Sequence, residues 1–344
     1  MKKIKEYDFL RVLVTIFVII SHCGYLIIES NYGGIDYTAY TSSMSIVYKV
    51  FKIIVRLLYA FHMPLFMALS GALFYISNSK PKYRNFKYIF KSKFERLMIP
   101  FMVVSLLYSI PIKYASGYFS DSKNVIKDIF IGQILVQGNS HLWYLISLFC
   151  IFILVFLLER LPIKSIVIKY ILLFILFIIG HYIRINLMSY IMIFAFWFYT
   201  GFIFEAIRDK YNKHVSCIKT MFVAVLFLIL FIIKYKTAKD IIPLDMIISL
   251  TGMITTYNIC FLLKDSYITK TKIFNIMSND SFGMYLYSDP LNYVILLIIP
   301  IIGPWLISNN IGSILLISTR FIITSIVSVI ISELLRKNKV KYLV

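Results

Sequence analysis

The strongest constraint on this chain is its series of apolar runs of about 20 residues, because each run is long enough to cross the hydrocarbon core of a bilayer as a helix. Hydrophobic residues make up 60% of the 344 residues, and the mean hydropathy is +0.83. A soluble core does not need this much apolar surface, so the composition excludes a soluble globular protein. We expect an all-α, polytopic integral membrane protein.

The apolar runs predict about ten transmembrane helices by the length criterion. The spans are expected near residues 8–28, 48–77, 95–112, 142–159, 165–181, 188–207, 217–235, 241–263, 282–302 and 310–335. The second span is too long for one straight crossing, and Pro64 predicts a kink in it. The segment 124–137 is apolar but short, which indicates a re-entrant or interfacial position. No connecting stretch is long enough for a separate domain, so residues 1–344 are expected to form one transmembrane domain.

Basic residues outnumber acidic ones by 36 to 16, which gives a net charge of +20. Such a charge can indicate nucleic-acid binding. Here the charges lie in short loops between apolar spans, mostly on one side, and the positive-inside rule explains them without a polyanion. No nucleic-acid partner is expected. Both ends of the chain fall on the basic side, so both termini are predicted to be cytoplasmic, which requires an even number of spans.

The cysteines indicate neither a disulfide nor a metal site, because no two have the CxxC spacing and all lie in or beside apolar spans. They are expected to be small buried hydrophobic residues: Cys23, Cys150, Cys217 and Cys260. No metal is expected. The sequence also lacks the phosphate-binding loop of ATP-driven transporters, the serine-hydrolase elbow and the zinc-protease helix motif.

The first span carries two ionisable residues, Arg11 near its start and His22 deep inside it. Eleven residues are close to three helical turns, so both side chains lie on one face, about 16 Å apart. Asp8 lies on the same side, three residues before Arg11. A lipid-facing charge at membrane depth is costly, so this face is expected to turn toward protein or water.

The run YDFLRVLVTIFVIISH, residues 7–22, resembles the opening helix of the acyltransferase-3 superfamily, whose hallmark is a basic residue, ten intervening residues and a histidine. Further runs resemble motifs of the same family in the same order along the chain. They are FHMPLFMALSG (61–71), KSKFERLMIP (91–100), HLWYLISLF (141–149) and SFGMYLYSDPL (281–291). The resemblance implies a multi-pass enzyme, in the plasma membrane of a bacterium, that moves an acyl group, usually acetyl, from acyl-CoA to a glycan or similar acceptor.

His22 matches the essential histidine of that family. A ring that titrates near neutral pH suits a general base that takes a proton from an acceptor hydroxyl. The alternative role is a hydrogen bond between helices, although an ionisable group inside a membrane favours function. His62, at a similar predicted depth, is a second catalytic candidate, with an interhelical hydrogen bond equally open. Beside it, Ser70 and Gly71 are expected to allow close approach of another helix.

Arg11 lies near the cytoplasmic end of the first span, where a positive-inside anchor is common. The alternative is a functional role, in which the Arg11 guanidinium binds a phosphate group of CoA through its paired N–H donors. The separation from His22 is of the order that a pantetheine arm spans, so Arg11 is counted with both the catalytic and the donor-binding candidates. Lys93 and Arg96, three residues apart, are expected to share a helical face. They are the other candidates for holding CoA phosphates, with a purely topological role as the alternative.

The outer side of the predicted bundle carries several polar and aromatic residues. Trp143 fits an interfacial anchor, because tryptophan is enriched at membrane boundaries whatever the function. His141, His181 and Arg184 are candidates for the lining of an acceptor vestibule.

The last motif departs from the family pattern, because Ser288 stands where histidine is frequent and Asp289 follows it. Asp289 and Arg320 are opposite charges inside two spans, and unpaired charges at membrane depth are expensive. We expect them to form a structural ion pair, with a catalytic role as the alternative.

The resulting prediction is a membrane O-acyltransferase that takes acetyl or another acyl group from acyl-CoA. Its acceptor is a hydroxyl of a cell-surface polysaccharide or of the lipid-linked precursor, and membrane lipids surround it. The main rival is a polysaccharide or lipid-linked oligosaccharide transporter, although the hydropathy lacks the two-halves symmetry of many transporters. A structural partner of a glycan synthase is a further rival, in which His22 would be replaceable.

Overall fold

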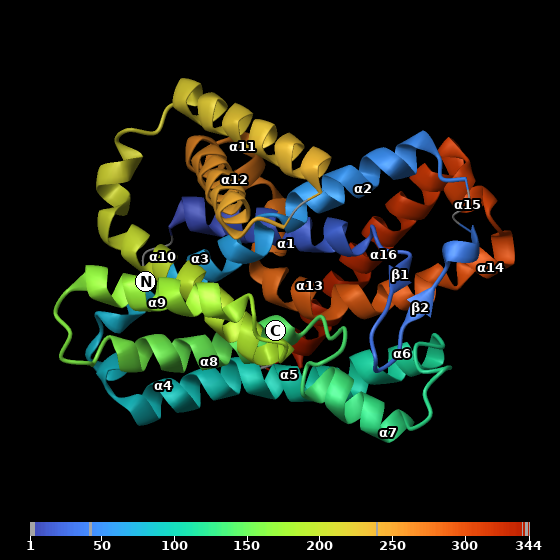
Figure 1. Cartoon of the computed structure of the whole chain (residues 1–344), viewed down its shortest axis with the longest axis horizontal. Coiled ribbons are helices and arrows are strands. Elements are labelled where there is room, and N and C mark those ends of the chain that lie inside the picture. Colours follow the sequence, from blue (N-terminus) through green and yellow to red (C-terminus); the bar gives the residue numbers. More distant parts are fainter. Residues whose placement is uncertain (1–3, 41–42, 239, 339, 341–342, 344) are drawn as a thin grey trace.

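A computed structural model describes residues 4–40, 43–238, 240–338, 340 and 343. Most of the helices run roughly along one long direction, and α1 passes through the middle of the bundle (Figure 1). Within the described part, seven helical segments are long and apolar enough to cross a membrane, and shorter apolar helices cover 143–158 and 166–180. The chain is therefore a helical membrane protein, as predicted. The count of ten spans stays a prediction.

The elements follow one another in the order that the apolar runs predict. The first part of the chain forms α1 (Lys5–His22), β1 (Ile27–Ile28), β2 (Ile35–Asp36), the 3-10 helix η1 (Thr38–Tyr40), α2 (Ile46–Tyr59), α3 (His62–Asn78), the 3-10 helix η2 (Pro81–Arg84), α4 (Phe86–Lys93), the π-helix η3 (Phe94–Met98), α5 (Ile99–Val104), the π-helix η4 (Ser105–Ser109), α6 (Ile110–Ala115), α7 (Val125–Asp128) and the π-helix η5 (Ile129–Ile134). The second part forms α8 (Trp143–Leu158), α9 (Ile166–Gly180), α10 (Asn186–Asn212), α11 (Cys217–Thr237), α12 (Ile242–Leu263), the 3-10 helix η6 (Tyr267–Lys270), α13 (Lys272–Leu296), α14 (Ile298–Ile302), α15 (Trp305–Ser308) and α16 (Asn310–Lys337).

The kink predicted in the second span is a break between α2 and α3, just ahead of Pro64. Proline has no N–H, so the carbonyl four residues earlier, that of Ala60, loses its helical partner. Ser249 of α12 donates its hydroxyl to this carbonyl at 2.7 Å. A neighbouring helix thus satisfies the group that proline frees, as a break inside a membrane requires.

The predicted close helix approach at Gly71 is confirmed, and α10 is the partner. A Cβ on Gly71 would lie 1.8 Å from the Phe198 carbonyl oxygen, and a Cβ on Gly201 would lie 1.8 Å from that of Ala68. Small residues on both helices therefore let the α3 and α10 backbones touch. Ser70 bonds in another direction, to the Tyr144 hydroxyl of α8 at 2.9 Å.

The third span is not a regular α-helix, because two π-helical turns, η3 and η4, interrupt it. Each is followed closely by a proline, Pro100 or Pro111, whose ring disturbs the ladder of hydrogen bonds in the preceding turn. Lys93 closes α4 whereas Arg96 lies within η3. The α-helical spacing assumed for this pair therefore does not apply across it.

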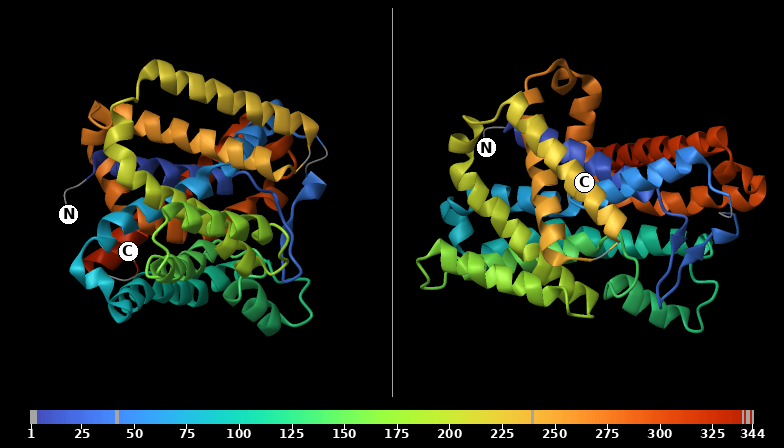
Figure 2. Two further views of the ribbon diagram at one scale, coloured as in Figure 1. Left: turned by 60° about the vertical axis from the view of Figure 1, so that its left-hand side comes forward. Right: turned by 45° about the horizontal axis from the view of Figure 1, so that its top comes forward.

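Non-spanning segments cover the end of the bundle where α1 finishes. The β1–β2 hairpin lies beside α7 in two views (Figures 1 and 2). A second hydrophobic cluster is centred here, and it includes Ile35 of β2, Tyr118, and Tyr293 of α13. The segment 124–137 forms the short α7 and η5 rather than a crossing. Ile27 and Ile28 of β1 line the same cavity as His22.

Candidate functional site

Asp289 of α13 brings together the histidines of two distant segments. Its Oδ1 lies 2.9 Å from Nδ1 of His22, at the end of α1. Its Oδ2 lies 3.5 Å from Nδ1 of His141, just before α8. The Tyr25 hydroxyl donates to Oδ1 at 3.1 Å. Asp289 and His141 are buried, so the carboxylate is an internal bridge between the two rings.

The carboxylate contact favours one tautomer of His22. A carboxylate can only accept a proton, so at 2.9 Å from Asp289 we assign the ring proton of His22 to Nδ1. Nε2 then keeps a lone pair that can take a proton from another group. This is the arrangement by which an aspartate orients a histidine base in hydrolytic triads. His141 differs, because its Nε2 lies 3.1 Å from the Leu286 carbonyl oxygen, to which it can only donate.

Arg320 does not form the ion pair predicted for it, and the prediction was wrong. Its guanidinium donates to the His22 and Tyr25 carbonyls at 2.8 and 2.9 Å, and to Asn292 Oδ1 at 2.9 Å. It is fully buried. A cation at the carboxyl end of a helix is favourable because the helix dipole is negative there. Arg320 therefore fixes the end of α1, which carries His22, against α13, which carries Asp289.

Lys113 of α6 is a buried cation that the sequence analysis did not single out. Its ammonium donates to Gln133 Oε1 at 2.8 Å and to the Asn139 carbonyl. It also lies over the rings of Tyr118 and Tyr293, 4.7 and 5.1 Å from their centroids. The available signal was a lone lysine directly after the third predicted span, 95–112. Its positive charge attracts the Asp289 carboxylate.

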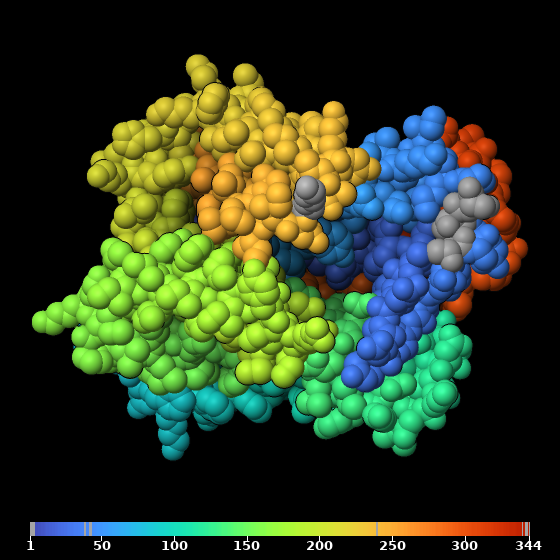
Figure 3. Space-filling model, in the orientation of Figure 1, coloured from blue at the N-terminus to red at the C-terminus, as the bar shows by residue number. Residues whose placement is uncertain are grey.

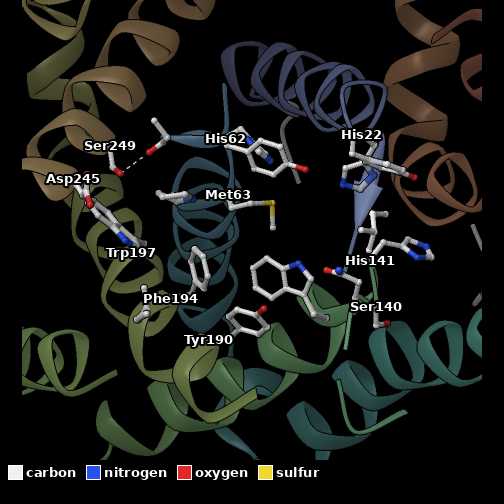
Figure 4. A pocket seen from close by; sticks show the side chains of 18 of the residues that line it. His22, His62, Met63, Ser140, His141, Tyr190, Phe194, Trp197, Asp245 and Ser249 are labelled. Carbon is white, nitrogen blue, oxygen red and sulfur yellow. Dashed lines mark hydrogen bonds between the residues drawn. The ribbon is translucent and has the colours of Figure 1, made fainter. Parts of the chain in front are cut away.

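His22 opens onto a cavity of about 660 Å³. The molecular surface is hollowed between α12, α10 and the α2–α3 region (Figure 3). His22 and His141 lie at one end of the cavity, and Asp245 and Ser249 lie at the other (Figure 4). His62 lies between these ends. The cavity is thus long enough to bring a ligand held far from His22 into contact with the base.

His62 is buried and has one nitrogen engaged. Its Nδ1 lies 2.7 Å from the Leu58 carbonyl, to which it can only donate, so Nε2 keeps a lone pair. The observed bond runs within the broken second span rather than to another helix. The residue nonetheless lines the cavity with His22.

The residues predicted to bind the donor form a second group, nearer the start of α1. Arg11 donates to Asp8 at 3.0 Å and to the Ser278 carbonyl at 3.1 Å. Asp8 thus orients Arg11, with which it was predicted to share a helical face. Arg96 is close enough to interact electrostatically with Arg11 and with Lys93. The Lys93 ammonium lies 3.7 Å from the centroid of the Phe152 ring. Three cations from two spans therefore gather in one region.

The residues predicted for the outer vestibule do not all lie in the same place. His141, His181 and Trp143 line the cavity, so the Trp143 ring contributes to the site as well as to the boundary. Arg184 is exposed and is not among the described residues that line it. Two of the three residues predicted for the vestibule therefore line the cavity, and Trp143, which was predicted only as an interfacial anchor, lines it as well.

A family model for the acyltransferase domain, acyltransferase-3, matches residues 4–333. The chain belongs to the acyltransferase-3 family. Searches among curated proteins and among solved structures gave no match. Family membership makes this protein a membrane acyltransferase with an acyl donor, and the match includes every residue of the two groups described above.

In the part of the chain that the structure describes, no group of three or more His, Cys, Asp and Glu residues is arranged to hold a metal ion. All four cysteines are free. Cys23 and Cys260 are buried, as expected, but Cys217 is exposed at the start of α11, because the predicted span begins there.

Proposed function

We propose that this acyltransferase moves an acyl group, acetyl in the first instance, from acyl-CoA to a hydroxyl of a cell-surface polysaccharide or its lipid-linked precursor. The observation that carries the proposal is the contact of His22 Nδ1 with Asp289, which leaves Nε2 as a base in a cavity. The family supplies the acyl-transfer chemistry. We place the protein in a bacterial plasma membrane, with acyl-CoA, the glycan and lipids as its partners.

The reaction follows from this geometry. Nε2 of His22 takes the proton of the acceptor hydroxyl as the oxygen attacks the thioester carbonyl. The new C–O bond forms, the C–S bond breaks, and the proton passes from His22 to the departing CoA thiolate. Asp289 stabilises the positive imidazole ring in between. His62 assists through its free Nε2, as a second polar group beside the reacting atoms.

The overall proposal is tested by the mass of the product. Cells with and without the protein are compared by mass spectrometry of their surface glycans, and the purified protein is supplied with labelled acetyl-CoA and the isolated glycan. We expect an acetyl increment in the glycan and release of free CoA. A transporter would change the location of the glycan but not its mass, so an unchanged mass would support the rival function.

The donor site is proposed at Arg11, Lys93 and Arg96, because a cluster of cations suits CoA phosphates. Arg11→Ala and Arg96→Ala should each weaken acetyl-CoA binding by about ten- to a hundredfold, since a charge-assisted hydrogen bond is worth about 1.5–3 kcal/mol. Equilibrium binding to the purified proteins measures this. Arg84→Ala, an exposed arginine in η2, is the matched control. Parent-like binding in both variants would remove these residues from the donor site.

We propose ten spans with both termini in the cytoplasm. Lys5 bonds Asp265 at 2.6 Å, and Arg208 contacts Glu6 at 2.7 Å. The starts and ends of several predicted cytoplasmic segments thus meet at one end of the bundle, which supports this topology. A reporter fused after Lys341, which lies outside the described residues, should be active only as a cytoplasmic reporter. One inserted within 30–45 should be external, and an external C-terminus would contradict the span count.

A further inference from the structure

One wall of the cavity is an aromatic shelf, which we define as Trp143, Tyr190 and Phe194. Tyr190 and Phe194 are four residues apart on α10 and so share one helical face. The Trp143 centroid lies 4.4 Å from that of Tyr190 and 5.1 Å from that of Phe194. All three side chains are half-buried and line the cavity. They therefore offer π surface to a ligand rather than only to the protein core.

The far end of the cavity carries a lysine paired with two carboxylates. Lys234 of α11 donates to Asp245, near the start of α12. The two side chains remain 33% and 34% exposed, so both still reach solvent in the cavity. The carboxylate of Asp240 lies 3.8 Å from the same ammonium, so the group has no excess positive charge that would attract an acidic ligand. A carboxylate held this way accepts hydrogen bonds from hydroxyl groups.

These two features match one class of ligand. The faces of a neutral pyranose ring carry weakly positive C–H groups, which pack against the negative face of an aromatic ring. Its hydroxyls need acceptors, which Asp245 supplies. A shelf without polar groups would suit a lipid chain, and an unpaired cation would suit an acidic sugar. The combination of the shelf with carboxylates and a cation that is already paired favours a neutral sugar over both.

We propose that Tyr190, Phe194 and Asp245 form the subsite that binds a neutral pyranose of the acceptor and presents its hydroxyl to His22. Tyr190 and Phe194 lie along the wall between Asp245 and the histidines (Figure 4). A cavity of about 660 Å³ is within the range of about 300–1,000 Å³ that holds small ligands. The inference rests on the proposed function, because it names the acceptor class of the same cavity.

Tryptophan fluorescence can follow this binding directly. The chain has three tryptophans, and Trp143 and Trp197 line the cavity. Trp305→Phe removes the remaining one, in α15. The full chain in lipid nanodiscs is titrated with methyl β-glucopyranoside and N-acetylglucosamine as neutral probes, glucuronate as an acidic probe and phenol as an aromatic probe without a sugar ring. We expect a saturable change with at least one neutral sugar, and weaker binding of glucuronate and phenol.

Substitutions then locate the subsite. Tyr190→Ala and Phe194→Ala should each weaken the sugar by about two- to tenfold, the value of an aromatic contact. Tyr190→Phe, which keeps the ring, should bind as the parent does, and Asp245→Asn should bind more weakly. Tyr182→Ala is the matched control, because Tyr182 is 76% exposed near the same end of the bundle. It should have no effect.

The inference is overturned if no neutral sugar binds saturably, if glucuronate or phenol binds more tightly, or if Tyr190→Ala behaves like Tyr182→Ala. Its fate is separable from that of acyl transfer, because binding needs no chemistry. Sugar binding in a protein that never acylates a glycan would leave the subsite standing and remove the proposed function. Acyl transfer without sugar binding would do the reverse.

Discussion

His22→Gln should lower the rate of acyl transfer by about 10²–10⁴, the usual effect of losing a general base. Glutamine can keep a hydrogen bond to Asp289, but it cannot take and return a proton near neutral pH. The chemical step therefore loses its base while the fold keeps its contacts. Transfer from labelled acetyl-CoA to the glycan, normalised to folded protein, measures the loss.

Two comparisons separate catalysis from packing in this experiment. His22→Ala should lose as much activity as His22→Gln, with little change in the melting temperature of either. Acetyl-CoA binding should stay at the parent level in both, because the proposed phosphate contacts lie at the other end of α1. If His22→Gln keeps activity within a few-fold of the parent, the ring has only a structural role and the proposed base is wrong.

Asp289→Asn should have a comparable effect, a fall in kcat of up to about 10⁴, as occurs when a triad aspartate is replaced by asparagine. Asparagine is the same size, but its amide can offer a donor where His22 needs an acceptor. The ring can then carry its proton on Nε2, which removes the lone pair from the cavity. The Asp289→Asn variant also loses the negative charge that stabilises the His22 imidazolium.

The expected signature is a loss in kcat with the KM for acetyl-CoA nearly unchanged. Tyr25→Phe is the graded control, because it removes only the hydroxyl that donates to Oδ1 of Asp289. It should cost far less than Asp289→Asn. Equal losses in the two variants would mean that the whole cluster acts as one structural unit. A parent-like kcat in Asp289→Asn would show that Asp289 does not orient the base.

The sequence was sufficient wherever a rule acts along a single helix. Apolar length predicted a helical membrane protein, and helical periodicity put Asp8 within reach of Arg11. Pro64 predicted the interruption of the second span. Gly71 predicted a close helix contact, because no other residue lets two backbones approach so far. Each of these depends on the local chain and on the bilayer, so no knowledge of neighbours was needed.

The partners of the buried charges were decided by tertiary structure. A charge inside a membrane must find a partner, and the sequence requires this for Asp289 and Arg320 alike. It does not say which of several polar groups on other helices is within reach. Opposite charge alone predicted that Asp289 pairs with Arg320. In the structure, Asp289 contacts His22 and His141, whereas Arg320 donates to carbonyls at the end of α1. Helix packing fixes these pairings, because hydrogen bonds act only over about 3 Å and helix positions are set by the summed contacts of many apolar side chains.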